Sequence, residues 1–283
     1  MRTRIITAIV AVCVLIPALV FSDTWFFPTM VALFCVLALW EIFKCVGLVK
    51  NLWVTLPIYI AGAFVILSYR LFCKAKSFGT GDFIARVATP CVILILLYLF
   101  ATMVFSKGKI TVSDVSAAGF MSIYVISGMA AILFLRDAEK GQYTYLLIFI
   151  GAWITDIFAY FTGLLLGRHK LIPEISPKKT IEGSIGGIVF CGLAFMGYGI
   201  AIQHFVENAT RMNLGLLFLY GVIISIVSQI GDLSLSAVKR QYGIKDFGKI
   251  FPGHGGVLDR FDSILAVSLM LFVLNEFAGI FTA

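Results

Sequence analysis

The sequence predicts an all-α, polytopic integral membrane protein with about nine transmembrane helices and a cytoplasmic N-terminus. The first observation is composition: 60% of the 283 residues are hydrophobic and 13% are charged, whereas a soluble domain carries about 25% charged residues. The second is that the apolar residues form continuous runs of about the 20 residues that a helix needs to cross a bilayer. Lipid offers the backbone no hydrogen-bond partners, so such runs must be helical. The composition therefore excludes a soluble enzyme, a disordered regulator and a disulfide-stapled secreted module.

The nine apolar runs follow one another with short polar connections. The first, residues 5–21, comes directly after Arg2 and Arg4 and resembles a signal peptide. No A-x-A cleavage site follows it, so we expect a retained helix. The other runs predict helices over residues 25–46, 52–72, 83–105, 117–135, 143–166, 184–206, 214–230 and 263–281.

The basic residues predict how the chain is oriented. The net charge of +7 is typical of the positive-inside signal of a membrane protein and does not indicate nucleic-acid binding. With the N-terminus in the cytoplasm, 15 of the 22 Lys and Arg residues fall in cytoplasmic segments and 7 fall outside. One outward-facing loop opposes this prediction, because Arg70, Lys74, Lys76 and Arg86 lie in it or beside it.

The charged residues gather in two places. We expect residues 1–140 to hold five N-terminal helices and residues 141–283 to form a catalytic membrane domain with cytoplasmic loops at 168–182 and 231–262. These two loops contain 15 of the 37 charged residues, and the predicted topology puts both on one side of the membrane. The scarcity of charge elsewhere indicates that a polar functional site lies in these loops.

The longer loop mixes carboxylates, cations and glycines, which suits a site for phosphate and metal. Mg²⁺ prefers one or two carboxylates with phosphate and water oxygens, and glycines let backbone N–H groups approach an anion. Asp259 and Asp262 share one face at the start of the last helix, and Asp232 follows the eighth, so Asp232 and Asp259 would hold one metal. The alternative is that these acids only cap helices and pair with Lys239 and Arg260.

Other charged residues also have two interpretations. Lys178 and Lys179 follow the helix-stopping Pro177, and they form either a phosphate clamp or an ordinary positive-inside loop. Asp156 lies midway along the sixth run, where a charge costs at least about 2.5 kcal/mol and is functional by default. The alternative interpretation is that Asp156 is a structural acid that pairs with a lysine. Glu41 lies near the end of its run, where contact with water explains it more simply.

Residues 236–262 resemble the signature of the phosphatidate cytidylyltransferases, or CDP-diacylglycerol synthases. The resemblance includes a serine three residues before Lys239-Arg240, then Lys245-Asp246, Gly248, His254-Gly255-Gly256, Asp259-Arg260 and Asp262. The Ser-Pro-Lys-Lys-Thr-Ile-Glu-Gly block from Ser176 and the Asp156/Tyr160 segment are also similar to that family. The resemblance covers roughly residues 145–283, whereas the five N-terminal helices match only in being hydrophobic.

The resemblance implies an enzyme of phospholipid biosynthesis that transfers CMP from CTP to phosphatidate, giving CDP-diacylglycerol and pyrophosphate. It implies Mg²⁺, with a possible second cation, and a homodimer. We expect a bacterial inner membrane with the active site facing the cytoplasm. The metal ligands would be Asp232 and Asp259. The catalytic residues would be Asp232, Asp259, Lys239, Arg240, Asp262 and His254, and the substrate-binding residues Lys178, Lys179, Asp156, Lys245, Asp246, Arg260, Gly255 and Gly256.

Two other functions remain open on the sequence. A secondary transporter would also place an acid such as Asp156 at membrane depth, but the charge here lies in one-sided loops. A CTP-dependent transferase acting on another lipid phosphate, such as an archaeal-type ether lipid, would carry the same signature.

Overall fold

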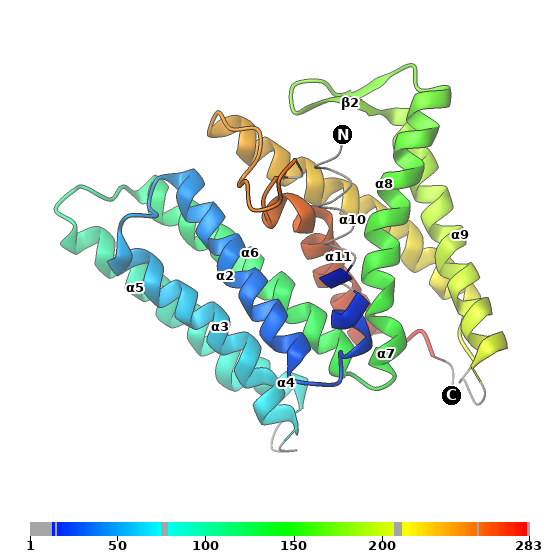
Figure 1. Ribbon diagram of the computed structural model, residues 1–283, viewed down its shortest axis with the longest axis horizontal. Coiled ribbons are helices and arrows are strands. Elements are labelled where there is room, and N and C mark those ends of the chain that lie inside the picture. The colour runs from blue at the N-terminus through cyan, green and yellow to red at the C-terminus, as the bar shows by residue number, and fades with distance from the viewer. Residues whose placement is uncertain (1–12, 15, 75–78, 207–210, 254, 282–283) are drawn as a thin grey trace. The chain divides into compact units, whose positions relative to one another are not determined.

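The computed structural model describes residues 13–14, 16–74, 79–206, 211–253 and 255–281, and it is almost wholly helical (Figure 1). Within these residues, seven helices are long and apolar enough to cross a membrane. They correspond to the second to eighth predicted runs, which confirms a mostly helical, multi-span membrane protein. The first predicted helix lies largely outside the described residues. The ninth run forms a helix that carries four charged residues and is not one of the seven.

The chain divides into two compact units. The first contains Met1–Asp137 and Tyr242–Phe261, and the second contains Ala138–Gln241 and Asp262–Ala283. In chain order the elements are α2 (Phe26–Val46), α3 (Leu52–Lys74), α4 (Thr80–Phe83), the π-helical turn η1 (Ile84–Ala88), α5 (Thr89–Phe105), α6 (Val112–Asp137), α7 (Gly141–Thr144), α8 (Leu146–Leu166), β1 (Lys170–Ile172), β2 (Ser176–Thr180), α9 (Ile181–Phe205), α10 (Leu214–Gln241) and α11 (Leu258–Phe277).

Pro57 and Pro90 lie inside apolar spans of the first unit, and at each the local structure compensates for the proline. Pro57 has no N–H to donate to the carbonyl of Trp53, four residues earlier in α3. The hydroxyl of Tyr98 from α5 donates to that carbonyl instead. Pro90 follows η1, and the residue four before it, Arg86, lies inside this wider turn, which relieves the clash that a proline ring makes with that carbonyl.

A buried cation explains part of the basic loop that opposed the predicted orientation. Arg70 is 1% exposed, and its guanidinium donates to both carboxylate oxygens of Asp137, with Nε 3.0 Å from Oδ2. It also donates to the carbonyls of Ser22 and Thr24. Its charge is therefore balanced inside the first unit, and Arg70 carries little weight as a topological signal. The cytoplasmic N-terminus stays a prediction.

Glycines set the packing of α8 and α9, which lie side by side in the second unit (Figure 1). A Cβ atom at Gly183 would lie 2.5 Å from the carbonyl oxygen of Ala159, and one at Gly187 would lie 3.0 Å from that of Thr155. Gly183 and Gly187, four residues apart, therefore allow the two helices to pack closely.

Two polar segments have more regular structure than the sequence predicted. Helix α10 continues from the apolar run to Gln241, because Gly231, Leu235 and Lys239 repeat every four residues as a buried stripe. Asp232, Lys239 and Arg240 therefore lie on a helix, and the two cations suit the negative end of its dipole. Most of the predicted 168–182 loop is an antiparallel hairpin of β1 and β2 that leads into α9.

Candidate active site

The loop between α10 and α11, residues 242–257, contains most of the signature. Gly243, Gly253 and Gly255 have positive φ angles of 66°, 79° and 89°, a conformation that side chains with a Cβ rarely adopt. The N–H of Phe251 donates to the carbonyl of Gly255 at 2.9 Å and closes a tight turn. The glycines thus allow a folded loop between the two helices. His254 lies outside the described residues.

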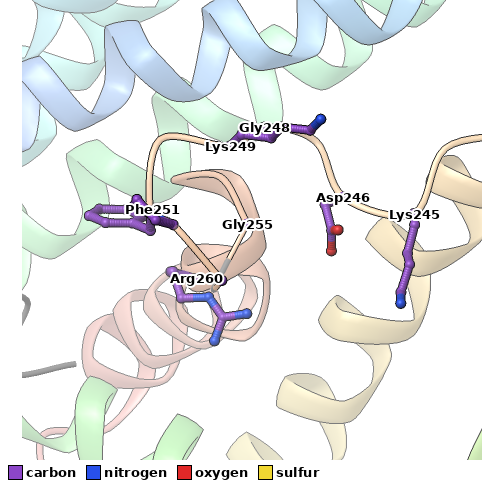
Figure 2. Close-up of a pocket in the computed structure, with 9 residues that line it drawn as sticks. Lys245, Asp246, Gly248, Lys249, Phe251, Gly255 and Arg260 are labelled. Carbon is purple, nitrogen blue, oxygen red and sulfur yellow. The ribbon is translucent and has the colours of Figure 1, made fainter. Parts of the chain in front are cut away.

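This α10–α11 loop and the first turn of α11 surround an open cavity of about 750 Å³ in the first unit. Figure 2 shows the side chains of Lys245, Asp246 and Arg260 extending from the backbone on the same side. With Lys249, the lining carries three cations and one acid, which suits a polyanion. The volume lies in the range of small-molecule sites. The lining residues are Lys245, Asp246, Gly248, Lys249, Phe251, Pro252, Gly253, Gly255 and Arg260.

Asp259 holds this loop against the start of α11. The side chain is 6% exposed, and its Oδ2 accepts hydrogen bonds from the N–H groups of Phe247 at 2.8 Å and Gly256 at 2.9 Å. A carboxylate in the first turn also complements the positive end of the helix dipole. These contacts give the acid a structural role in the loop, and its role as a metal ligand stays a prediction.

A second carboxylate in the first unit, Glu41 of α2, also contacts the loop. It is 0% exposed, and it accepts hydrogen bonds from the N–H groups of Val257 at 3.0 Å and Leu258 at 2.8 Å. These are among the donors that a helix N-terminus leaves unsatisfied. The expectation that Glu41 reaches water is wrong, because burial and backbone donors replace water. The signal that could have found it is an acid inside an apolar run.

Carboxylates and ammonium groups gather in the second unit, and we call this group the Asp232 cluster. Its members come from α10 (Asp232 and Lys239), α11 (Asp262), α8 (Asp156) and β2 (Lys179). The Nζ of Lys179 lies 2.5 Å from Oδ2 of Asp232. The pKa of Asp262 is raised to about 7, first by burial and then by the negative charge of Asp232, with a smaller contribution from Asp156. The N–H of Ser263 and the charge of Lys239 act in the opposite direction.

The Asp232 cluster fits a divalent cation in its chemistry. Its oxygens are the hard ligands that Mg²⁺ prefers, and a cation would offset the negative charge of Asp232 that acts on Asp262. Among the residues that the structure describes, no group of three or more His, Cys, Asp or Glu side chains is arranged so that it could hold a metal ion. Asp232 belongs to the second unit and Asp259 to the first, so their pairing rests on the sequence.

The hairpin of β1 and β2 brings Lys179 beside Asp232, and residues next to Lys179 in the sequence hold this hairpin in place. Thr180 accepts a hydrogen bond from the N–H of Gly183 at 3.1 Å and caps α9. Glu182 accepts from the N–H of Arg168 at 3.1 Å and lies 2.6 Å from Nδ1 of His169. Sequence reasoning did not assign Glu182 a role, although it ties the two ends of the hairpin together.

The other predicted residues of the second unit lie at its surface. Lys178 is exposed on β2, and Arg240 is exposed at the end of α10, where Nε donates to the carbonyl of Ile175 at 3.5 Å. Asp156 is exposed on α8 in the isolated chain and is near enough to Asp262 to influence it. The second unit thus brings together Asp156, Lys179, Asp232, Lys239 and Asp262.

Comparison with known proteins extends the similarity over the whole chain. Residues 2–278 match the model of the cytidylyltransferase family. The phosphatidate cytidylyltransferase of Staphylococcus haemolyticus (strain JCSC1435) is 36% identical over 276 residues, which are 97% of this chain and 98% of that protein. Those of Staphylococcus aureus (strain COL) and Staphylococcus epidermidis (strain ATCC 12228 / FDA PCI 1200) are 34% and 33% identical, again over 97% of this chain and 98% of theirs. The similarity therefore includes the N-terminal helices.

Proposed function

This chain belongs to the cytidylyltransferase family, and from that membership we propose which of its residues carry out the reaction of a phosphatidate cytidylyltransferase. Family and full-length relatives give this function to the chain: it transfers CMP from CTP to phosphatidate, for lipid biosynthesis. Full-length similarity to enzymes also favours an enzyme over a transporter.

We propose that the cavity of the α10–α11 loop binds the triphosphate of CTP. The observation that carries this assignment is the set of three cations, Lys245, Lys249 and Arg260, around one open cavity. Arginine binds phosphate oxygens in a bidentate manner, whereas each lysine acts as a mobile point charge. The glycines of the lining leave the backbone accessible to the anion.

We propose that Asp232 holds Mg²⁺, with Asp259 as the second carboxylate that the sequence indicates. The crowded carboxylates of the Asp232 cluster support a cation at Asp232. When bound, Mg²⁺ would offset the negative charge of the phosphates during transfer. Lys239 and Asp262 adjust the charge beside Asp232, and Lys179 reaches the same carboxylate.

The nucleophile in this proposal needs no general base. A phosphate monoester has a second pKa of about 6, so the phosphatidate oxygen is already largely deprotonated at neutral pH. That oxygen forms a bond to the α-phosphorus of CTP, and the α–β bridging oxygen leaves with its electron pair as part of pyrophosphate. The residues therefore position two polyanions and reduce their repulsion. His254 would orient a phosphate or donate to the leaving pyrophosphate.

The membrane supplies the lipid substrate. The chain is an integral membrane protein with several candidate spans, and the staphylococcal relatives named above are bacterial proteins. We propose that the site faces the cytoplasm, where CTP is dissolved, and that Lys178 and Lys179 bind the phosphatidate head group. We also propose that the chain forms a homodimer.

The direct test supplies purified protein with α-labelled CTP, phosphatidate and Mg²⁺. We expect a labelled CDP-lipid and unlabelled pyrophosphate, and no lipid product when phosphatidate is omitted. A parallel reaction with an ether-lipid phosphate measures acceptor preference. A higher kcat/KM for the ether lipid than for phosphatidate would overturn phosphatidate as the substrate.

Neutralising the cations of the cavity should weaken CTP binding. We expect Lys245→Met and Arg260→Met each to raise the KM for CTP about 10-fold, since each removes a charge-assisted hydrogen bond to phosphate. The KM for phosphatidate should stay within about 2-fold of the wild type. Steady-state kinetics with each substrate varied in turn measure both. The control is Arg86→Met, which removes an exposed arginine that pairs with Asp82 at 3.5 Å and should change neither constant.

A further inference from the structure

The α10–α11 loop is held by two carboxylates that come from opposite ends of the chain. Asp259 accepts the N–H groups of Phe247 and Gly256, and Glu41 accepts those of Val257 and Leu258. One donor, Phe247, lies within the segment that lines the cavity, Gly256 and Val257 follow that segment, and Leu258 is the first residue of α11. Glu41 therefore fixes the loop where Asp259 alone would leave two buried donors unsatisfied.

Two glycines of the loop are required by Glu41. A Cβ atom at Gly248 would lie 2.0 Å from Oε1 of Glu41, and one at Gly256 would lie 2.1 Å from the same atom. Gly248 and Gly256 are not among the glycines with positive φ, so their backbone conformation does not demand glycine. Glycine is needed at both positions because the side chain of Glu41 occupies the space that a Cβ atom would fill. Glu41 thus gives a physical reason for two glycines of the signature.

A buried carboxylate at position 41 is unfavourable if only the stability of the fold is considered. Its carboxylate lies near that of Asp259, which is unfavourable, and the charge of Lys44 compensates only in part. The favourable contacts are the backbone donors and the positive end of the α11 dipole. An apolar residue would avoid burying a charge in this helix, but it would not accept the N–H groups of Val257 and Leu258. The contacts of this acid with the two N–H groups therefore point to a role in holding the loop.

We propose that Glu41 is a positioning residue for the CTP site: it sets the α10–α11 loop so that Lys245, Lys249 and Arg260 surround the triphosphate. Glu41 does not line the cavity and acts through the backbone of the loop. The proposal rests on the assignment of this cavity to CTP. It gives the N-terminal helices, which the signature does not reach, a part in nucleotide binding.

The first test compares Glu41→Gln with the wild type. The amide keeps the size of the side chain but replaces one acceptor with a donor that faces a backbone N–H. We expect the KM for CTP to rise about 10-fold, the cost of one lost charge-assisted hydrogen bond, with the KM for phosphatidate within about 2-fold. The control is Glu276→Gln, an exposed acid in the last turn of α11, which should leave both constants unchanged.

A double substitution tests the contact itself. Gly248→Ala should lower kcat/KM for CTP about 10²-fold, because its methyl group collides with the carboxylate of Glu41. In the Glu41→Ala background the carboxylate no longer collides with the methyl group, and the remaining close neighbour is the Cα of Gly256 at 3.1 Å. Adding Gly248→Ala there should cost only about 3-fold. This non-additivity is the signature of direct contact. Independent, additive losses would overturn the proposed contact.

The results separate this inference from the function on which it rests. If Arg260→Met and Lys245→Met leave the KM for CTP unchanged, the cavity is not the CTP site and both proposals fail. If they raise it but Glu41→Gln does not, the CTP site stands and the positioning role of Glu41 is wrong. If Glu41→Gln raises the KM for CTP and the KM for phosphatidate equally and lowers the melting temperature in detergent, the role of Glu41 is purely structural. That result would also overturn the proposal.

Discussion

Replacing Asp232 by Asn should lower kcat at least about 10²-fold, the scale of one electrostatic element of a catalytic site. The carboxylate lies 2.5 Å from the ammonium of Lys179, and its charge acts on Asp262, so it interacts with both a cation and an acid of the Asp232 cluster. Asparagine has nearly the same shape as aspartate, but it lacks the negative charge that binds Mg²⁺ in our proposal. Initial rates of CDP-lipid formation at saturating CTP and phosphatidate measure the loss.

The matched control for this variant is Asp82→Asn. Asp82 is an exposed acid that pairs with Arg86 four residues on, and such surface pairs contribute little. It should keep the wild-type rate. An Asp232→Asn enzyme within about 3-fold of the wild type, with the same requirement for Mg²⁺, would contradict the assignment of Asp232.

Asp259→Asn should also lower kcat at least about 10²-fold. Comparing it with Asp259→Ala separates the effect of the lost charge from the effect of the lost loop contacts. The amide oxygen of Asn can still accept the N–H groups of Phe247 and Gly256, which are now 2.8 and 2.9 Å from Oδ2. The loop should therefore keep its conformation while the site loses a charge. Asp259→Ala loses the charge and the loop contacts together.

We expect a melting temperature in detergent close to that of the wild type for Asp259→Asn and a lowered one for Asp259→Ala. Activity of Asp259→Asn near the wild type, with a normal dependence on Mg²⁺, would show that Asp259 serves the loop alone. The sequence-based pairing of Asp232 with Asp259 at one metal would then be wrong.

The helices were the most predictable part of the molecule, because apolar runs of spanning length leave the backbone no alternative in lipid. Their ends were less predictable. Helix α10 continues to Gln241, beyond its apolar run, because a buried stripe through Leu235 and Lys239 lies among charged residues. The hairpin was not predicted because β1 and β2 are only three and five residues long and show no clear alternation of apolar and polar side chains.

The site was predictable where its residues are close in sequence, and hidden where the fold joins distant ones. The signature indicated the α10–α11 loop, and the structure gathers Lys245, Lys249 and Arg260 around a cavity there. Glu41 is 216 residues from Val257, so no local pattern connects it to the loop. Only the packing of α2 within the first unit makes it visible.

The central claim is that CMP transfer depends on a metal ion held by carboxylates, and removal of the metal tests it most directly. Purified protein is stripped with a chelator, and the rate of CDP-lipid formation is measured as Mg²⁺ is added back. The account predicts no turnover without metal and a saturable return to the full rate, with a much lower plateau for Asp232→Asn. Full turnover by the stripped wild-type protein would contradict it.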